Sequence, residues 1–186
     1  MGQKDILVKI SRLLNRENIP YLLTGSLAVA YYGFPRGTHD IDFVIEIKTK
    51  DLRKIFRLTE RLGNKYIFDK NQIKKAIKNF SQFNIYHPDS GIKVDFWVSR
   101  QNDFERSKFQ RRKKIFISRQ KIFLISAEDL ILTKLLWYQK LPSERHLTDC
   151  KGIWKVQQKN LDKKYLNFWI EKLGLKNVFK EAKNEA

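Results

Sequence analysis

Cysteine and long apolar runs are scarce in this chain of 186 residues. Its one cysteine, Cys150, excludes an internal disulfide bond and fits a reducing compartment, so we expect a cytoplasmic protein. Residues 1–14 alternate charged and apolar side chains at helical spacing, which is typical of neither a signal peptide nor a membrane anchor. No apolar run approaches the roughly 20 residues that cross a bilayer, and we expect no membrane partner.

Acidic residues are also few relative to basic ones. The chain has 38 Lys and Arg against 20 Asp and Glu, a formal net charge of +18. Such a charge attracts polyanions, of which nucleic acid is the usual one. An acidic membrane surface, an acidic partner or a Lys-rich solvated surface are the alternatives. With 42% hydrophobic residues the chain can bury a core, and its length suits one domain or a catalytic core with a helical appendix.

The hydrophobic patterns predict an α/β (α+β) fold, a small mixed sheet flanked by helices. We expect helices at 4–17, 26–33 (with Ser26 at or near the N-cap), 50–63 and 71–80, and strands at 21–23, 39–47, 81–87, 92–99, 115–118 and 121–125. From Ser126 onward the pattern is helical, at 127–139, 143–158, 162–173 and 175–183. The chain thus divides into a core over 1–125 and a helical C-terminal subdomain over 126–186 that packs on it.

Two aspartates stand out in the strand "HDIDFVIEI". Asp40 and Asp42 are two residues apart, so in a strand their side chains point to the same face. Paired carboxylates repel each other unless a cation or proton lies between them, and oxygen ligands are those that Mg²⁺ prefers. Asp95 in "KVDFWV" is an acid in an apolar strand of the same local pattern, and it could complete the site.

A phosphate site is indicated just before these acids. Gly25 and Ser26 lie at a strand-to-helix turn, where free backbone N–H groups and a hydroxyl converge on an anion. Arg36 and Thr38 could bring a guanidinium and a hydroxyl to the same place. A phosphate cradle beside paired acids is the layout of metal-dependent phosphoryl or nucleotidyl transfer.

The segment "TGSLAVAYYGFPRGTHDID" resembles the nucleotidyltransferase signature of the DNA polymerase β superfamily, in which a third acid follows on a later strand. More closely, the chain resembles the minimal nucleotidyltransferases related to the AbiE-type (AbiEii) toxins of abortive-infection systems. The later motifs "SAEDLILTKLLWYQK" and "SERHLTDCKGIWKVQ" are similar to those of that group, although Thr148 stands where the group often has a basic residue. The resemblance covers roughly residues 20–175.

This resemblance implies a nucleotidyltransferase fold and a role for each matching residue. The catalytic, metal-binding acids would be Asp40, Asp42 and Asp95, with Asp95 aligned with the attacking hydroxyl. The nucleotide site would comprise Gly25, Ser26, Arg36, Thr38, Lys134 and Asp149. Mg²⁺ or Mn²⁺ would be the cofactor and an NTP the co-substrate. From the residues alone, Lys134 could equally extend from a helix flank to solvent.

A basic segment follows the strand of Asp95. Between Arg100 and Lys121 the chain carries nine cations against two acids: Arg100, Arg106, Lys108, Arg111, Arg112, Lys113, Lys114, Arg119 and Lys121, with Asp103 and Glu105. We interpret this segment as a contact for an RNA backbone, the alternative being a solvated surface.

The leading hypothesis is an enzyme that transfers an NMP from an NTP to an acceptor hydroxyl, with RNA, in particular tRNA, as acceptor. The family resemblance adds a toxin role and a cognate antitoxin. A second hypothesis places the nucleotide on a protein or small molecule. A third is a nucleic-acid-binding or antitoxin-like module without turnover, against which the three intact acids argue.

Overall fold

A six-stranded mixed sheet lies at the centre of the molecule, and the computed structural model describes residues 1–184. The strands are β1 (Tyr21–Thr24), β2 (Asp40–Ile45), β3 (Gln82–His87), β4 (Ile92–Val98), β5 (Lys113–Ile117) and β6 (Gln120–Leu124). Their order across the sheet is β3-β4-β2-β1-β6-β5. Strands β2 and β4 are parallel, as are β1 and β6, and the other pairs are antiparallel. The predicted mixed sheet flanked by helices is confirmed.

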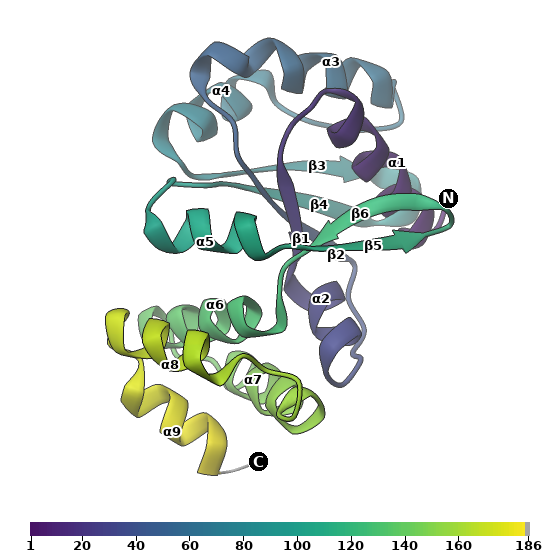
Figure 1. The fold of residues 1–186 in the computed structure, drawn as a ribbon. Coiled ribbons are helices and arrows are strands. Elements are labelled where there is room, and N and C mark those ends of the chain that lie inside the picture. The colour runs from purple at the N-terminus through teal and green to yellow at the C-terminus, as the bar shows by residue number, and fades with distance from the viewer. Residues whose placement is uncertain (185–186) are drawn as a thin grey trace.

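The helices form layers on both sides of this sheet (Figure 1). On one side lie α1 (Gln3–Arg16), α3 (Leu52–Leu62) and α4 (Lys70–Asn79). On the other lie α2 (Gly25–Tyr32), α5 (Asp103–Arg111), α6 (Ala127–Lys140), α7 (Glu144–Gln157), α8 (Lys163–Lys172) and α9 (Lys176–Asn184). No described helix is long and apolar enough to cross a membrane.

Strand periodicity decides which residues of the sheet are buried. Ile41, Phe43 and Ile45 alternate along β2 and are fully buried. Phe43 lies in register with Phe96 of β4, which lies in register with Phe83 of β3, and these three rings stack in a row. Because successive side chains of a strand point to opposite faces, Asp40 and Asp42 lie on the other face of β2.

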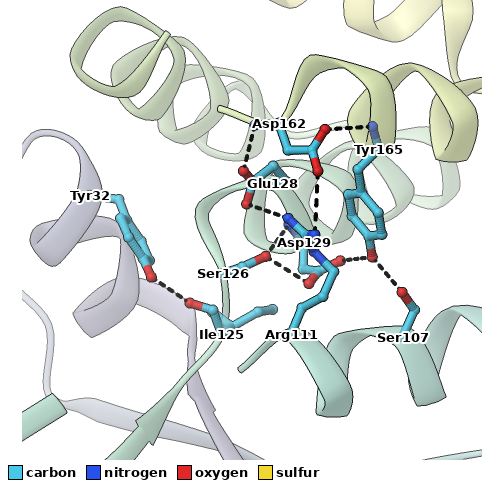
Figure 2. A network of polar contacts seen from close by, with 9 residues as sticks. All are labelled: Tyr32, Ser107, Arg111, Ile125, Ser126, Glu128, Asp129, Asp162 and Tyr165. Atoms are coloured by element: carbon cyan, nitrogen blue, oxygen red, sulfur yellow. Dashed lines mark hydrogen bonds and ion pairs between the residues drawn. The ribbon is translucent and has the colours of Figure 1, made fainter. Parts of the chain in front are cut away.

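A buried polar network joins the sheet side of the molecule to its C-terminal helices (Figure 2). The Ser126 hydroxyl caps α6 by accepting from the Asp129 backbone N–H. The Tyr165 hydroxyl of α8 lies 2.6 Å from an oxygen of Asp129 and 2.8 Å from the Ser107 hydroxyl of α5. Arg111 of α5 lies over the Tyr165 ring, at 3.8 Å from its centre. The network holds α5, α6 and α8 together.

The sequence patterns predicted no element in the middle of the basic segment, and they located the start of α2 only approximately. The Asp103–Arg111 stretch of the basic segment is helix α5, capped by the Asn102 side chain, which accepts from the Glu105 N–H. Ser26, which was expected at or near the N-cap of α2, is the second residue of the helix, and Thr24 is the N-cap. Gly33 does end α2, and it lies so close to Ile153 of α7 that a Cβ would meet its backbone nitrogen at 2.9 Å.

Candidate active site

The three predicted catalytic acids lie on one face of two neighbouring strands. In the parallel pairing of β2 with β4, Asp42 is the register partner of Asp95, and Asp42 also faces Thr24 of β1. Asp40 is half-exposed, whereas Asp95 is buried. Adjacent strands are about 4.8 Å apart, so the register brings the three acids close to one another.

Lys93 completes this cluster, and the sequence analysis missed it. Its ammonium lies 2.9 Å from Oδ2 of Asp95 and 3.6 Å from Oδ1 of Asp40. The contact with Asp95, by hydrogen bond and charge, raises the pKa of Lys93. Lys93 stands two residues before Asp95, the same spacing that paired Asp40 with Asp42, and that repeat was the available signal.

Asp42 is the acid of the cluster whose carboxylate form is destabilised by its surroundings. Burial, and then the negative charges of Asp95 and Asp40, raise its pKa from 3.8 to about 6. The cations Lys134 and Lys93 act in the opposite direction but do not outweigh burial. A carboxylate in this position is stabilised by any further cation that approaches it.

Gly25 joins the acids to the start of α2. It has a positive φ of 65°, and a Cβ built on it would lie 1.9 Å from Oδ2 of Asp42. Only glycine fits this conformation and this contact. The Thr24 side chain makes no cap hydrogen bond, so the first N–H groups of α2 beside Gly25 and Ser26 have no side-chain cap. An anion at this helix end would lie directly beside the acid cluster.

Arg36, Lys134 and Asp149 form a second charged group. Nε of Arg36 lies 3.2 Å from Oδ1 of Asp149, and its NH2 nitrogen 3.3 Å from Oδ2. Lys134 of α6 lies 2.8 Å from Oδ2 of Asp149 and is itself buried. Burial tends to raise the pKa of Asp149, but the hydrogen bonds from Arg36 and Lys134 outweigh it and hold that pKa below its usual value. Asp149 therefore fixes the two cations in place.

Thr38 and Lys134 have clear positions relative to the acids. The Thr38 hydroxyl accepts from the Asp40 backbone N–H at 3.1 Å, so it orders the start of β2. Lys134 does not extend to solvent, and its charge lowers the pKa of Asp42. The structure thus brings Lys134 toward the acid cluster and uses Asp149 to hold it.

The acids are the donor type that a divalent cation takes, and at present two of them pair with Lys93. Among residues 1–184, no three carboxylate, histidine or cysteine side chains already enclose a point where a metal could bind. Oδ1 of Asp95 is buried without a hydrogen-bond partner, however, and Lys93 is the cation now nearest the acids. Three carboxylates, one of which has an oxygen without a hydrogen-bond partner, are the hard donor set that Mg²⁺ takes.

The basic segment is only in part a surface. Lys108 is buried and bonds Glu105 at 2.6 Å, and Arg111 belongs to the network of Figure 2. The exposed members are Arg100, Arg106, Lys113, Lys114, Arg119 and Lys121. A surface hollow of about 590 Å³ lies beside α5 and is lined by Glu46, Arg106, Phe109, Gln110, Arg112 and Phe123.

Comparisons with known proteins find solved structures that are similar to this chain. No family model matches the chain, and no curated protein matches it. The solution structure of the antibiotic-resistance factor ANT(2'')-Ia is similar over 98% of this chain and 97% of its own, with a TM-score of 0.62 at 14% identity. ANT(2'')-Ia in complex with adenylyl-2''-tobramycin gives a TM-score of 0.58 at 12% identity, over 95% and 98% of the two chains.

A third solved structure is also similar over most of its length. An antigenic nucleotidyltransferase-like protein of Paracoccidioides brasiliensis is similar over 96% of this chain and 90% of its own, with a TM-score of 0.56 at 18% identity. At such identities the likeness concerns the fold. The chain has the nucleotidyltransferase fold.

Proposed function

We propose that the protein is a metal-dependent nucleotidyltransferase, which moves an NMP from an NTP to an acceptor hydroxyl and releases pyrophosphate. The observation that carries this proposal is the contact of Gly25 with Asp42, where a Cβ would lie 1.9 Å from the carboxylate. It joins an anion site at the start of α2 to a row of three acids. Triphosphate and metal need such adjacent sites.

Each residue of the site has a role in this reaction. The N–H groups at Gly25 and Ser26 hold triphosphate oxygens, and Arg36 and Lys134 add positive charge. Asp40 and Asp42 would ligate Mg²⁺ or Mn²⁺. When bound, the metal supplies charge to the transferred phosphoryl group and lowers the pKa of the attacking hydroxyl.

Asp95 acts on the acceptor side, as metal ligand or base. The acceptor hydroxyl oxygen forms a bond to the α-phosphorus, and the bond from that phosphorus to the bridging oxygen of pyrophosphate breaks. The hydroxyl proton goes to the Asp95 carboxylate or to water. Lys93, which pairs with Asp95 and Asp40, would compete with a metal for these carboxylates, because like charges repel.

RNA, in particular tRNA, is the acceptor that the charge favours. A net charge of +18 and six exposed cations of the segment 100–121 attract a phosphate backbone. A small-molecule acceptor is the second candidate, since the chain matches ANT(2'')-Ia over nearly its whole length. An aminoglycoside is a polycation, however, and so strongly basic a protein repels it at long range.

The test is to incubate purified protein with Mg²⁺, bulk RNA and each NTP labelled at its α-phosphorus, one at a time. We expect label on a tRNA-sized band, and none with the Asp40→Asn/Asp42→Asn variant. Label on a protein band, or on an added aminoglycoside, favours a protein or small molecule as the acceptor instead of RNA. Activity that survives the double substitution contradicts the proposed mechanism.

The motifs similar to AbiE-type nucleotidyltransferases support a role as the toxin of a toxin–antitoxin pair. Expression from a tightly controlled promoter should then arrest growth, and the Asp40→Asn/Asp42→Asn variant should not. Normal growth during wild-type expression, with activity retained in extracts, contradicts this role.

A further inference from the structure

The order of the strands places the anion site on one side of the acid cluster and strand β3 on the other. The anion site at α2 follows β1, and β2, β4 and β3 succeed it across the sheet. Asp42 of β2 faces Asp95 of β4, and Asp95 faces Asn84 of β3. One row along, Asp40 faces Lys93, and Lys93 faces Tyr86. Asn84 and Tyr86 therefore continue the acid rows onto the edge strand, on the side away from the anion site.

In the part of the chain that the structure describes, the side chains of Asn84 and Tyr86 do not stabilise the fold through polar contacts. Within residues 1–184, the Asn84 amide makes no hydrogen bond, and the Tyr86 hydroxyl and ring make no polar or ring contact. Tyr86 is 39% exposed. Farther along this face of the sheet, helices cover the side chains: Val44 packs against Phe109 of α5, and Trp97 against Trp137 of α6.

The backbone under Tyr86 is held firmly all the same. Its N–H donates to the Ile67 carbonyl at 2.9 Å, and the Ile67 N–H donates to the Tyr86 carbonyl at 2.8 Å. Strand β4 pairs with the other edge of β3. An exposed ring on a backbone fixed from both sides loses little conformational entropy when a ligand stacks on it.

We propose that Asn84 and Tyr86 bind the acceptor, as a ribonucleotide at the end of a single-stranded RNA. The base stacks on the Tyr86 ring, and the Asn84 amide hydrogen-bonds the sugar, so that the ribose hydroxyl reaches Asp95. Lys93 lies between Tyr86 and Asp40 in the register and supplies a cation for the phosphate. This inference rests on the proposed function and names the acceptor side of that same site.

Distances along the sheet agree with a bound nucleotide. Tyr86 pairs with Lys93, and Asp95 is the diagonal neighbour two residues on. Diagonal neighbours across an antiparallel pair lie about 7–8 Å apart, a span that the base and sugar of one nucleotide cover. RNA is favoured over an uncharged ligand because the net charge of +18 attracts a phosphate chain, and because an aromatic ring stacks on any base.

The experiment compares Tyr86→Ala, Tyr86→Phe and Ile67→Ala for binding of a short fluorescent single-stranded RNA, in EDTA. Ile67 is the matched control, because it is 60% exposed and shares the backbone pairing of Tyr86. Base stacking is worth about 1–3 kcal/mol, so we expect Tyr86→Ala to weaken binding about tenfold or more. Tyr86→Phe and Ile67→Ala should stay within about twofold of wild type.

Transfer kinetics separate this proposal from the function on which it rests. Tyr86→Ala should raise the KM for RNA about tenfold and leave the KM for the NTP unchanged. Wild-type transfer to RNA with an unaltered KM and oligonucleotide Kd in Tyr86→Ala overturns the acceptor site and leaves the function standing. The absence of NTP turnover with every acceptor overturns the function. Weakening by Ile67→Ala as strong as by Tyr86→Ala overturns the assignment to the ring.

Discussion

Asp42→Asn should stabilise the protein while it removes activity. The pKa of Asp42 is raised from 3.8 to about 6, chiefly by burial and then by Asp95 and Asp40. The folded state thus binds this proton more tightly than the unfolded chain does. Roughly two pKa units at ~1.4 kcal/mol each give a cost of about 3 kcal/mol for keeping the carboxylate ionised.

The cost depends on pH in a defined direction. It is absent below about pH 4, where the carboxyl is protonated in both states, grows as the pH rises toward 6, and is complete at pH 7.5. In EDTA at pH 7.5, Asp42→Asn should therefore raise the free energy of unfolding by up to about 3 kcal/mol, and at pH 4 by much less.

Urea unfolding, followed by circular dichroism at both pH values, measures this. Asp89→Asn, which changes an exposed turn carboxyl, serves as the control and should stay within about 0.5 kcal/mol of wild type. Saturating Mg²⁺ should stabilise wild type and not Asp42→Asn. A variant no more stable than wild type at pH 7.5, or a gain of equal size at pH 4, refutes the reasoning.

Three further predictions concern neighbouring residues. Gly25→Ala should abolish transfer and lower the melting temperature, because the new Cβ collides with Asp42; an active, stable variant contradicts the contact. Lys93→Met should lower the Mg²⁺ concentration needed for a thermal shift by several-fold, since no ammonium competes for the acids; an unchanged midpoint argues against displacement. Asp149→Asn should cost about 3 kcal/mol of stability and raise the KM for the NTP, because it leaves buried Lys134 without its partner; an unchanged KM would place that lysine outside the nucleotide site.

The elements of the fold could be predicted from the sequence wherever one period was clear. Strands with alternating buried residues, such as Phe43 and Ile45 of β2, and the capped start of α6 at Ser126 lie where the patterns indicated. Helix α5 escaped prediction because it buries few apolar side chains, among them Phe104 and Phe109, in a stretch rich in charge.

The candidate site was predictable in its residue types but not in its register. Asp42 and Asp95 were identified by their apolar surroundings, but only the pairing of β2 with β4 shows that they face each other. The position of Lys93 between Asp40 and Asp95 depends on the same register. Counting charges along the chain overestimated the positive charge on the surface of the basic segment. Lys108 is buried and pairs with Glu105 inside the protein.

The two faces of the sheet divide the requirements of folding and chemistry between them. The row of Phe43, Phe96 and Phe83 buries large apolar surfaces on one face, and each such side chain contributes a few kcal/mol. The opposite face of the same strands holds Asp42 at a cost of about 3 kcal/mol, in proportion to its raised pKa. The side chains of a strand alternate between its two faces. The six residues of β2 therefore contribute to the hydrophobic core on one face, and on the other they carry two acids that repel each other and that a cation would stabilise.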